Sequence, residues 1–301
     1  MSRFKLFEEK LKERKVKANI AVVNATIETA IDAAIEASSK GFAYPLFIGE
    51  KSKVEELLGE HRNKFKYEII DSKTEVESGK MAVELVKDGK ADVILKGSIN
   101  TSNFMKPILS KERGIVKSGS LVSHISVFSL ETYHKFLILS DVAININPTL
   151  EEKVKIIKNA IDLAKNLDIK SPKVAILAAT EIVNLKMQSS IDGAILSKMG
   201  DRGEFGDAIV DGPMAFDLAV SKESCKEKNF HSPVGADADI VIAPDINAAN
   251  ILYKSMAKLA KADIAAVLSG TKVPVVLTSR GDTAEVKYWS LLLALLLYKK
   301  Q

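Results

Sequence analysis

Three polar side chains follow one apolar run of the sequence. Lys96, Ser98 and Thr101 come directly after Asp92–Leu95, and Gly97 stands between the first two. An ammonium group, two hydroxyls and a glycine that permits close backbone approach would suit a phosphate at the start of a helix. The order Lys-Gly-Ser-x-x-Thr lacks the full spacing of a P-loop, so an ordinary turn explains it equally well.

A second polar segment, Thr278-Ser-Arg-Gly-Asp282, lies between an apolar run and a C-terminal helical pattern. Ser279 and Arg280 occupy the strand–helix turn, and Gly281 leaves room for a bulky ligand. Asp282 has two interpretations: it caps the following helix, or it accepts a proton in a reaction. Local sequence logic slightly favours the cap.

Residues 200–206 form a glycine-rich segment that contains Arg202 and precedes the short apolar run 208–210. Three glycines around one arginine are typical of a loop that presents a guanidinium to an anion. A structural interpretation competes, in which Pro213 begins a helix and the loop only connects two elements.

Two amides mark a fourth segment. Asn247 and Asn250 are three residues apart and follow Asp245, a good helix N-cap, after the apolar run 240–243. This spacing places both amides on one face of a helix near its N-terminus. We therefore expect a polar ligand close to this end of the strand.

Short apolar runs alternate with segments of helical periodicity along the chain. The expected strands are Asn19–Val23, Tyr44–Ile48, Tyr67–Ile70, Asp92–Leu95, Leu121–Phe128, Phe136–Leu139, Lys173–Ala178, Ala208–Val210, Ile240–Ala243, Ala265–Leu268 and Val273–Thr278. The expected helices include Thr26–Ser39, Thr74–Lys87, Thr149–Asn166, Lys186–Met199, Ile246–Ala260 and Thr283–Leu297. Capping boxes are expected at Ser52/Glu55, Thr74/Glu77 and Thr149/Glu152. The alternation predicts an α/β fold with parallel sheets covered by helices.

The length predicts two domains, because 301 residues exceed the usual size of one hydrophobic core. Asn145-Ile-Asn-Pro148 follows an apolar strand that ends near Asp141. Pro148 disfavours helical geometry at Asn147, which suits a crossing between domains. We place the boundary there, with a first domain over 1–144.

Composition excludes several classes of protein. The net charge of +4 is spread along the chain, and no basic stretch is interleaved with aromatics, so no nucleic-acid partner is expected. Cys225 is the single cysteine, which excludes a disulfide within the chain and fits a reducing cytoplasm. The four histidines never pair at helical spacing, so no metal is expected. The N-terminus lacks the apolar core of a signal peptide, and the run Trp289–Tyr298 is too short to span a membrane.

Together these motifs resemble the phosphate acetyltransferase and phosphate butyryltransferase family. The matching segments run in consistent order from about Ile20 to the C-terminus. They are Lys96-Gly-Ser-x-x-Thr101, Asp141 with Asn145-x-Asn-Pro148, Asp211-Gly-Pro-x-x-Phe-Asp217, Pro244-Asp-x-Asn-x-x-Asn250-x-x-Tyr253-Lys254 and Ser279-Arg-Gly281. Two further segments, Lys198–Gly203 and Leu121–Phe128, resemble the butyryl branch of the family and not the acetyl branch.

The resemblance implies two parallel-sheet α/β domains of the isocitrate/isopropylmalate dehydrogenase type, with the active site in the inter-domain cleft. The second domain would span 145–278, and 279–301 would fold back onto the first. The implied enzyme is a phosphate butyryltransferase, which moves a short acyl group between coenzyme A and inorganic phosphate. It would use coenzyme A as a substrate, hold no metal or bound cofactor, and act in the cytoplasm as a homodimer or larger assembly.

The resemblance also implies roles for single residues. By matching position, Ser279 would contact the reacting carbonyl or thiol, and Arg280 would hold a phosphate. The substrate-binding residues would be Lys96, Ser98, Thr101, His124, Arg202, Asn247 and Asn250. One departure stands out, because acetyl-branch members carry a catalytic aspartate where this chain has Val286. The thiol proton would then pass to Asp282, to His124 or directly to water.

Three alternatives stay open on the sequence. A phosphate acetyltransferase is the alternative of the same class, and the size of the acyl pocket would decide between the two. An NAD-dependent dehydrogenase of the same fold would need metal-binding carboxylates and a basic catalytic group, a set that these residues do not assemble, and no GxGxxG follows any strand. A non-enzymatic anion-binding protein would keep the arginine and serine but catalyse no acyl exchange.

Overall fold

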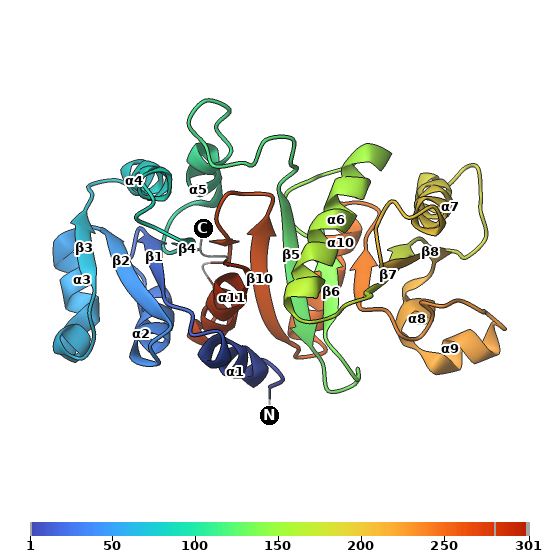
Figure 1. The fold of residues 1–301 in the computed structure, drawn as a ribbon, viewed down its shortest axis with the longest axis horizontal. Coiled ribbons are helices and arrows are strands. Elements are labelled where there is room, and N and C mark those ends of the chain that lie inside the picture. Colours follow the sequence, from blue (N-terminus) through green and yellow to red (C-terminus); the bar gives the residue numbers. More distant parts are fainter. Residues whose placement is uncertain (1, 280, 299–301) are drawn as a thin grey trace. The chain divides into compact units, whose positions relative to one another are not determined.

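A computed structural model describes residues 2–279 and 281–298 (Figure 1). The chain divides into two compact units: unit 1 is drawn from the ranges 1–120 and 265–301, and unit 2 from 121–264. The predicted domains differ from these units in two segments, since 121–144 belongs to unit 2 and 265–278 to unit 1. Strand pairing is the reason: β6 (Leu137–Ser140) pairs with β9 (Ile240–Ile242), and β11 (Val275–Val276) pairs with β4 (Val93–Lys96).

The sheet of unit 1 has the strand order β3-β2-β1-β4-β11-β10. Its other strands are β1 (Ala18–Val23), β2 (Ala43–Gly49), β3 (Glu68–Asp71) and β10 (Asp263–Ser269). β1 pairs in parallel with β2 and β4, β2 with β3, and β11 with β4. β1 and β4 are buried almost throughout, as parallel strands covered on both faces should be.

Helices cover both faces of this sheet. They are α1 (Lys5–Glu13), α2 (Glu28–Ser39), α3 (Lys51–Leu58), a 3-10 turn (Gly59–Asn63), α4 (Glu75–Lys87), α5 (Thr101–Ile108) and α11 (Ala284–Leu297). α4 and α5 pack side by side on one face, and α2 and α11 pack together on the other (Figure 1).

The core of unit 1 contains α11. Residues 287–296 are all buried, and the helix packs against α1, α2 and β11. A helix that is apolar on every side belongs in a core. Ser290 is 0% exposed, and its Oγ donates to the Val286 carbonyl at 2.7 Å and accepts from the Ala266 N–H at 2.9 Å. Lys287 is 1% exposed in the same stretch.

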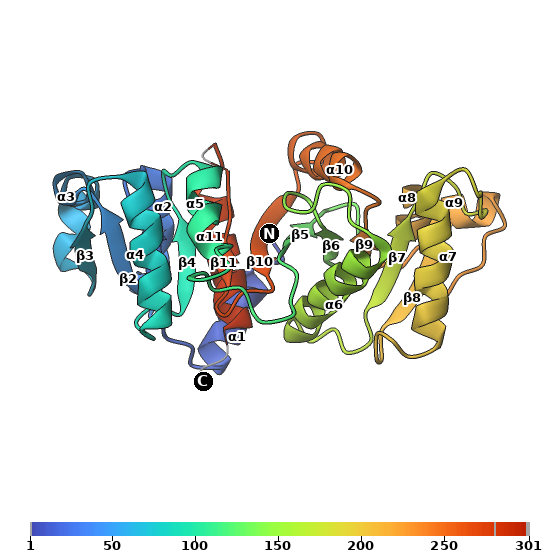
Figure 2. The same ribbon diagram turned by 90° about the horizontal axis from the view of Figure 1, so that it is seen from above.

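The sheet of unit 2 has the order β5-β6-β9-β7-β8, with β5 (Ser123–Ser129), β7 (Lys173–Leu177) and β8 (Ile209–Met214). The helices of this unit are α6 (Leu150–Asn166), α7 (Gln188–Asp201), α8 (Phe216–Val220), α9 (Lys222–Glu227) and α10 (Ile246–Lys258). Figure 2 shows α6 and α10 on opposite sides of β6 and β9.

A buried ion pair joins α6 to α7. The Lys153 Nζ lies 2.6 Å from the Asp192 Oδ2, and the two side chains are 5% and 6% exposed. Gln188 donates to the other carboxylate oxygen of Asp192 at 2.8 Å. Close packing of α7 on β8 depends on Gly193, since a Cβ there would lie 2.8 Å from the Pro213 Cα.

The sheets are mostly parallel, as expected, but two pairs of strands are antiparallel. β5 runs antiparallel to β6, and β10 runs antiparallel to β11. Both pairs are consecutive along their part of the chain and are joined by short connections that no helix interrupts. Such connections produce antiparallel neighbours, whereas parallel neighbours need a longer crossover.

The expected start of a helix at Pro213 is wrong. β8 continues through Gly212 and Pro213 to Met214, and the next helix begins at Phe216. Gly212 lies against β7, where an added Cβ would come within 2.8 Å of the Ile176 carbonyl oxygen. Proline is tolerated here because β8 is an edge strand in the sheet of unit 2.

Some of the expected helix caps form and others do not. Thr149 and Glu152 form the full capping box of α6, and Asp245 caps α10 through the N–H groups of residues 247 and 248. Thr74 caps α4, but the Glu77 carboxylate accepts from the Lys73 N–H instead of from its cap residue. The box at Ser52/Glu55 does not form, because α3 begins earlier, at Lys51. In the part of the chain that is described, none of the helices combines the length and apolar character that a membrane crossing needs.

Candidate functional site

Two of the predicted segments lie at the same edge of the unit 1 sheet. β4 and β11 are parallel neighbours in register, with Leu95 opposite Val276. Lys96 follows Leu95 directly, and Ser279 comes three residues after Val276. Because the carboxyl ends of parallel strands meet at one edge, the loop 96–101 and the turn 279–282 lie at the same edge of this sheet. Ligands of open α/β sheets bind at that edge.

The loop 96–101 is held against the end of β1. The Gly97 and Ser98 N–H groups donate to the carbonyls of Val23 and Asn24, each at 2.9 Å. A Cβ at Gly97 would lie 2.5 Å from the Asn24 carbonyl oxygen, so this glycine is required for backbone packing. Packing against β1 therefore explains the glycine at position 97 without the predicted approach of the backbone to an anion.

The polar groups of this loop differ in their exposure. Lys96 is 2% exposed at the end of β4, whereas Thr101 is exposed in the first turn of α5. Asn100 caps α5 by accepting from the Ser102 N–H at 2.9 Å. The Glu75 carboxylate accepts from the Asn100 N–H at 3.0 Å, which ties the loop to α4. The hydroxyl of Thr101 thus stands at a helix N-terminus whose position is fixed, a place that favours anions.

The turn 279–282 is closed by reciprocal hydrogen bonds. The Ser279 N–H donates to the Asp282 Oδ2 at 2.7 Å, and the Asp282 N–H donates to the Ser279 carbonyl at 3.2 Å. Asp282 does not cap α11, because Thr283 does so by accepting from the Val286 N–H. The prediction that Asp282 caps α11 is therefore wrong, because the cap lies one residue later. The Asp282 carboxylate instead orders the turn. Arg280 lies outside the described residues.

Sequence reasoning missed Lys287. Its Nζ donates to the carbonyls of Ser279 and Asp282 at 2.9 Å and 3.0 Å. Burial lowers the pKa of the Lys287 ammonium, and the nearby charge of Asp282 opposes that shift. The sequence does contain a signal that could have identified Lys287: it is a single lysine at the start of a long apolar helix. Lysine is rarely buried without a partner, so a charged residue at that position requires an explanation.

Unit 2 brings a second set of the predicted residues together. His124 is buried at the start of β5, and its carbonyl accepts from the Val142 N–H at 3.3 Å. Asn250 donates through its side chain to the Val142 carbonyl at 3.2 Å. Asn247 is exposed in the first turn of α10. His124, Asn247 and Asn250 therefore lie at the edge where β6 and β9 end.

The Asp141 carboxylate organises the loop beside these residues. It accepts from the N–H groups of Ala143, Ile144 and Asn145 at 3.0, 3.1 and 3.1 Å. The Asn145 side chain donates to the Val122 carbonyl at 2.9 Å. The expected motif around Asp141 and Asn145 thus holds the loop after β6, which lies at the same edge as His124.

Arg202 is not brought to this edge. It follows α7 and precedes β8, so it lies where the parallel strands β7 and β8 begin, at the opposite edge of the unit 2 sheet. Its side chain is exposed. Within unit 2, the structure therefore separates Arg202 from His124, Asn247 and Asn250.

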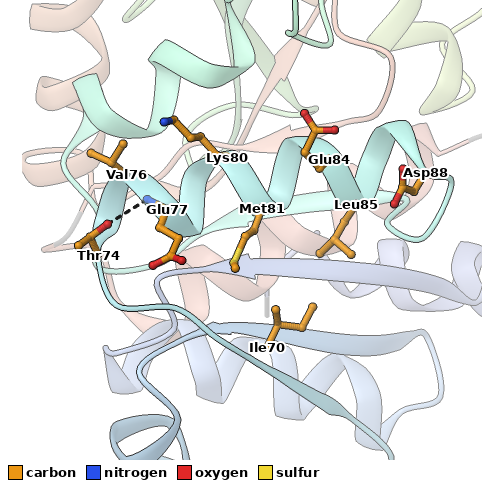
Figure 3. A pocket seen from close by; sticks show the side chains of 9 residues that line it. All are labelled: Ile70, Thr74, Val76, Glu77, Lys80, Met81, Glu84, Leu85 and Asp88. Atoms are coloured by element: carbon orange, nitrogen blue, oxygen red, sulfur yellow. Dashed lines mark hydrogen bonds between the residues drawn. The ribbon is translucent and has the colours of Figure 1, made fainter.

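Two hollows flank α4, and neither is lined by a residue predicted for the site. Figure 3 shows the first, of about 440 Å³, where Met81 and Leu85 of α4 face Ile70 of β3. The second is a groove of about 670 Å³ between α4 and α5. Its lining includes the cationic side chains Lys80, Lys87, Lys106 and Arg113, with Glu84 as the one carboxylate. We call this second hollow the basic groove.

The basic groove leads along α5, the helix that begins at Thr101. Asn103, at one end of its lining, is two residues after Thr101 and donates to Glu75 at 3.2 Å. Phosphate oxygens would find cations along the groove and helix N–H groups near its end. Among the residues that the structure describes, no group of three His, Cys, Asp or Glu side chains is arranged to hold a metal ion.

Comparison with known proteins gives the family. The family model described as "Phosphate acetyl/butaryl transferase" matches residues 61–295. The chain is 38% identical to a phosphate butyryltransferase of Clostridium acetobutylicum, over 95% of each chain. It is 41% identical to a phosphate acetyltransferase of Thermotoga maritima, over 96% of this chain and 99% of that one.

Solved structures agree with this result. The crystal structure of a branched-chain phosphotransacylase from Enterococcus faecalis superposes with a TM-score of 0.83 at 31% identity, covering 93% of this chain and 98% of that one. The loops after β4 and β11 fall within the range that the family model matches. The chain belongs to this family of phosphate acetyl- and butyryltransferases.

Proposed function

We propose that the protein transfers a short acyl group between coenzyme A and inorganic phosphate. One observation carries the proposal: a chain of this family places Lys96, Ser98 and Thr101 at the same sheet edge as Ser279 and Asp282. Acyl transfer needs positive charge for a phosphate, donors for the carbonyl oxygen and a base for the thiol. These five residues include a group of each kind.

In the proposed reaction the thiolate of coenzyme A attacks the carbonyl carbon of an acyl phosphate. The S–C bond forms, the C–O bond to phosphate breaks, and phosphate leaves with the electron pair. Asp282 accepts the thiol proton and later gives it to the phosphate. Ser279 donates to the carbonyl oxygen as negative charge develops there, and Arg280 and Lys96 balance the charge of the phosphate.

The basic groove is the proposed place for the phosphates of coenzyme A. That substrate is multiply anionic, and the groove presents four cations against one carboxylate. Asn103 of its lining is close in sequence to Thr101, so a long substrate bound in the groove could extend toward the edge where Ser279 lies. We keep His124, Asn247 and Asn250 as proposed substrate-binding residues of unit 2, at the carboxyl edge of its sheet.

Butyryl is the acyl group that we propose as preferred. The segments Lys198–Gly203 and Leu121–Phe128 resemble the butyryl branch, and Val286 stands where acetyl-branch members have an aspartate. A phosphate acetyltransferase is the second candidate, because the relative from Thermotoga maritima has that name at 41% identity. We also keep the isocitrate/isopropylmalate dehydrogenase type of fold, cytoplasmic location and a homodimer or larger assembly as proposals.

The test is phosphate-dependent release of coenzyme A from acetyl-, propionyl- and butyryl-thioesters. We expect release with all three and the highest kcat/KM with butyryl. Highest kcat/KM with acetyl would instead identify an acetyltransferase. No release from any thioester, by protein that still binds phosphate, would leave an anion-binding protein as the explanation.

A further inference from the structure

Lys287 is one of three buried lysines among the described residues, with Lys96 and Lys153. Lys153 has a carboxylate partner, Asp192, at 2.6 Å. The Lys287 ammonium instead donates to two main-chain carbonyls, those of Ser279 and Asp282, at 2.9 Å and 3.0 Å. Both acceptors belong to the turn that carries the proposed catalytic residues.

The position of Lys287 makes a charged group unfavourable. It belongs to the buried face of α11, and nine of the residues that follow it, 288–296, are also buried. Removing an ammonium group from water costs several kcal/mol, and an apolar side chain of the same length avoids that cost. The stability of α11 therefore does not explain a lysine here, whereas its contacts with the turn do.

The contacts of Lys287 complete the turn. The Ser279 N–H donates a hydrogen bond to the Asp282 carboxylate at 2.7 Å, and the Asp282 N–H donates one to the Ser279 carbonyl at 3.2 Å. The Lys287 ammonium donates to the carbonyls of both Ser279 and Asp282. It therefore fixes both ends of the turn to the first turn of α11. Ser279 is exposed and Asp282 half-buried, so the packing of their own side chains gives the turn little support.

We propose that Lys287 is a positioning residue for acyl transfer, which holds the Ser279 hydroxyl and the Asp282 carboxylate in their reactive arrangement through the two carbonyls. The proposal rests on the proposed function of Ser279 and Asp282. A misplacement of about 1 Å in reacting groups can lower a rate on the order of a hundredfold. Loss of the contacts should therefore lower kcat, whereas substrate binding through the loop 96–101 and the basic groove should persist.

Lys287→Met tests this, because methionine fills a similar volume without a donor. We expect kcat to fall at least tenfold, KM for phosphate and coenzyme A to change less than threefold, and the circular dichroism spectrum to match that of the unchanged protein. Ser290→Ala is the matched control, since Ser290 is equally buried on α11 and its hydroxyl bonds to Val286 and Ala266, which lie outside the turn. We expect its kcat to stay within twofold. A folded Lys287→Met variant with unchanged kcat would overturn the proposal.

Lys287→Gln is the second variant in case the methionine variant does not fold. Its amide is one atom shorter and cannot reach both carbonyls, so we expect at least a threefold lower kcat. An unchanged kcat in the folded glutamine variant would also overturn the proposal. Hydrogen exchange of a peptide covering the turn adds a measurement that does not depend on activity: exchange should be faster in Lys287→Met than in Ser290→Ala.

The outcomes separate this proposal from the proposed function. If the unchanged protein transfers no acyl group, the proposed function fails, and the exchange measurement still shows whether Lys287 holds the turn. If the unchanged protein is active and the Lys287 variants are equally active, the positioning role alone fails.

Discussion

The Ser279 N–H donates to the Asp282 Oδ2 at 2.7 Å, so the carboxylate proposed as the base also orders the serine beside it. Accepting a proton in the reaction and accepting a hydrogen bond from the backbone are different roles. A carboxylate has two oxygens, so each oxygen can take one of these roles. The Oδ2 is occupied by the backbone, which leaves the Oδ1 as the atom for the thiol proton. Substitutions can separate these roles.

Asp282→Asn should lower kcat on the order of a hundredfold, because the amide oxygen still accepts from the Ser279 N–H but cannot take a proton. Steady-state kinetics with butyryl-CoA and phosphate measure it. Thr283→Ala is the control: it removes the observed cap of α11 and should cost about 1 kcal/mol of stability with near-normal turnover. Near-normal turnover in Asp282→Asn would reject Asp282 as the base and direct attention to His124.

Arg280→Lys should raise KM for phosphate or for coenzyme A, because lysine keeps the charge but loses the planar fork that binds two phosphate oxygens. Initial rates against each substrate measure the effect. Arg202→Lys provides the comparison, since Arg202 lies at the opposite edge of the unit 2 sheet from His124 and Asn250. Unchanged constants in Arg280→Lys would show that Arg280 is structural.

Lys106→Glu should raise KM for coenzyme A on the order of tenfold, equal to about 1.4 kcal/mol of binding free energy. The reason is that reversing one charge in the basic groove opposes the phosphates of the substrate. The effect should shrink at high salt, because Lys106 is exposed. Lys111→Glu is an exposed charge reversal outside the groove lining and should leave KM within twofold. Equal effects of both variants would reject the groove as a binding site.

Asp192→Ala should lower the free energy of unfolding by about 3–5 kcal/mol, because it leaves the buried Lys153 ammonium without its partner. Asp201→Ala on the same helix removes an exposed pair with Lys198, and should cost less than about 1 kcal/mol. Urea unfolding followed by circular dichroism compares them. A loss of stability in Asp192→Ala no larger than in Asp201→Ala would show that solvent reaches the buried pair.

Much of the fold could be predicted because its signals are local. The alternation of apolar runs and helical segments predicts every strand and six of the helices to within a few residues, and the capping box at Thr149 formed as expected. The short helices α8 and α9 were not predicted. α3 shows the limit of such signals. It begins at Lys51, whose N–H donates to the Asp71 carboxylate at 3.0 Å. A partner twenty residues away can move a helix start, and no local pattern reports it.

The site was predictable in its segments and less so in its contacts. Loops at the ends of β4 and β11 were expected to carry chemistry, and strand order places them at one edge. Lys287 was missed because a lysine near the start of a helix is usually exposed, and only tertiary packing buries this one. Arg202 was expected at the site because a glycine-rich loop resembles an anion-binding loop, but the direction of α7 places it at the other edge of its sheet.

The core position of α11 also determines when the turn 279–282 can form during synthesis. Unit 2 is one continuous stretch, 121–264, whereas unit 1 needs segments on both sides of it. A ribosome therefore completes all of unit 2 before it makes α11, and we expect unit 2 to fold first on the nascent chain. Proteolysis of stalled chains would test this order: chains ending before 284 should protect unit 2 and leave unit 1 open to cleavage. The turn that carries the proposed catalytic residues would then be among the last parts of the protein to take shape.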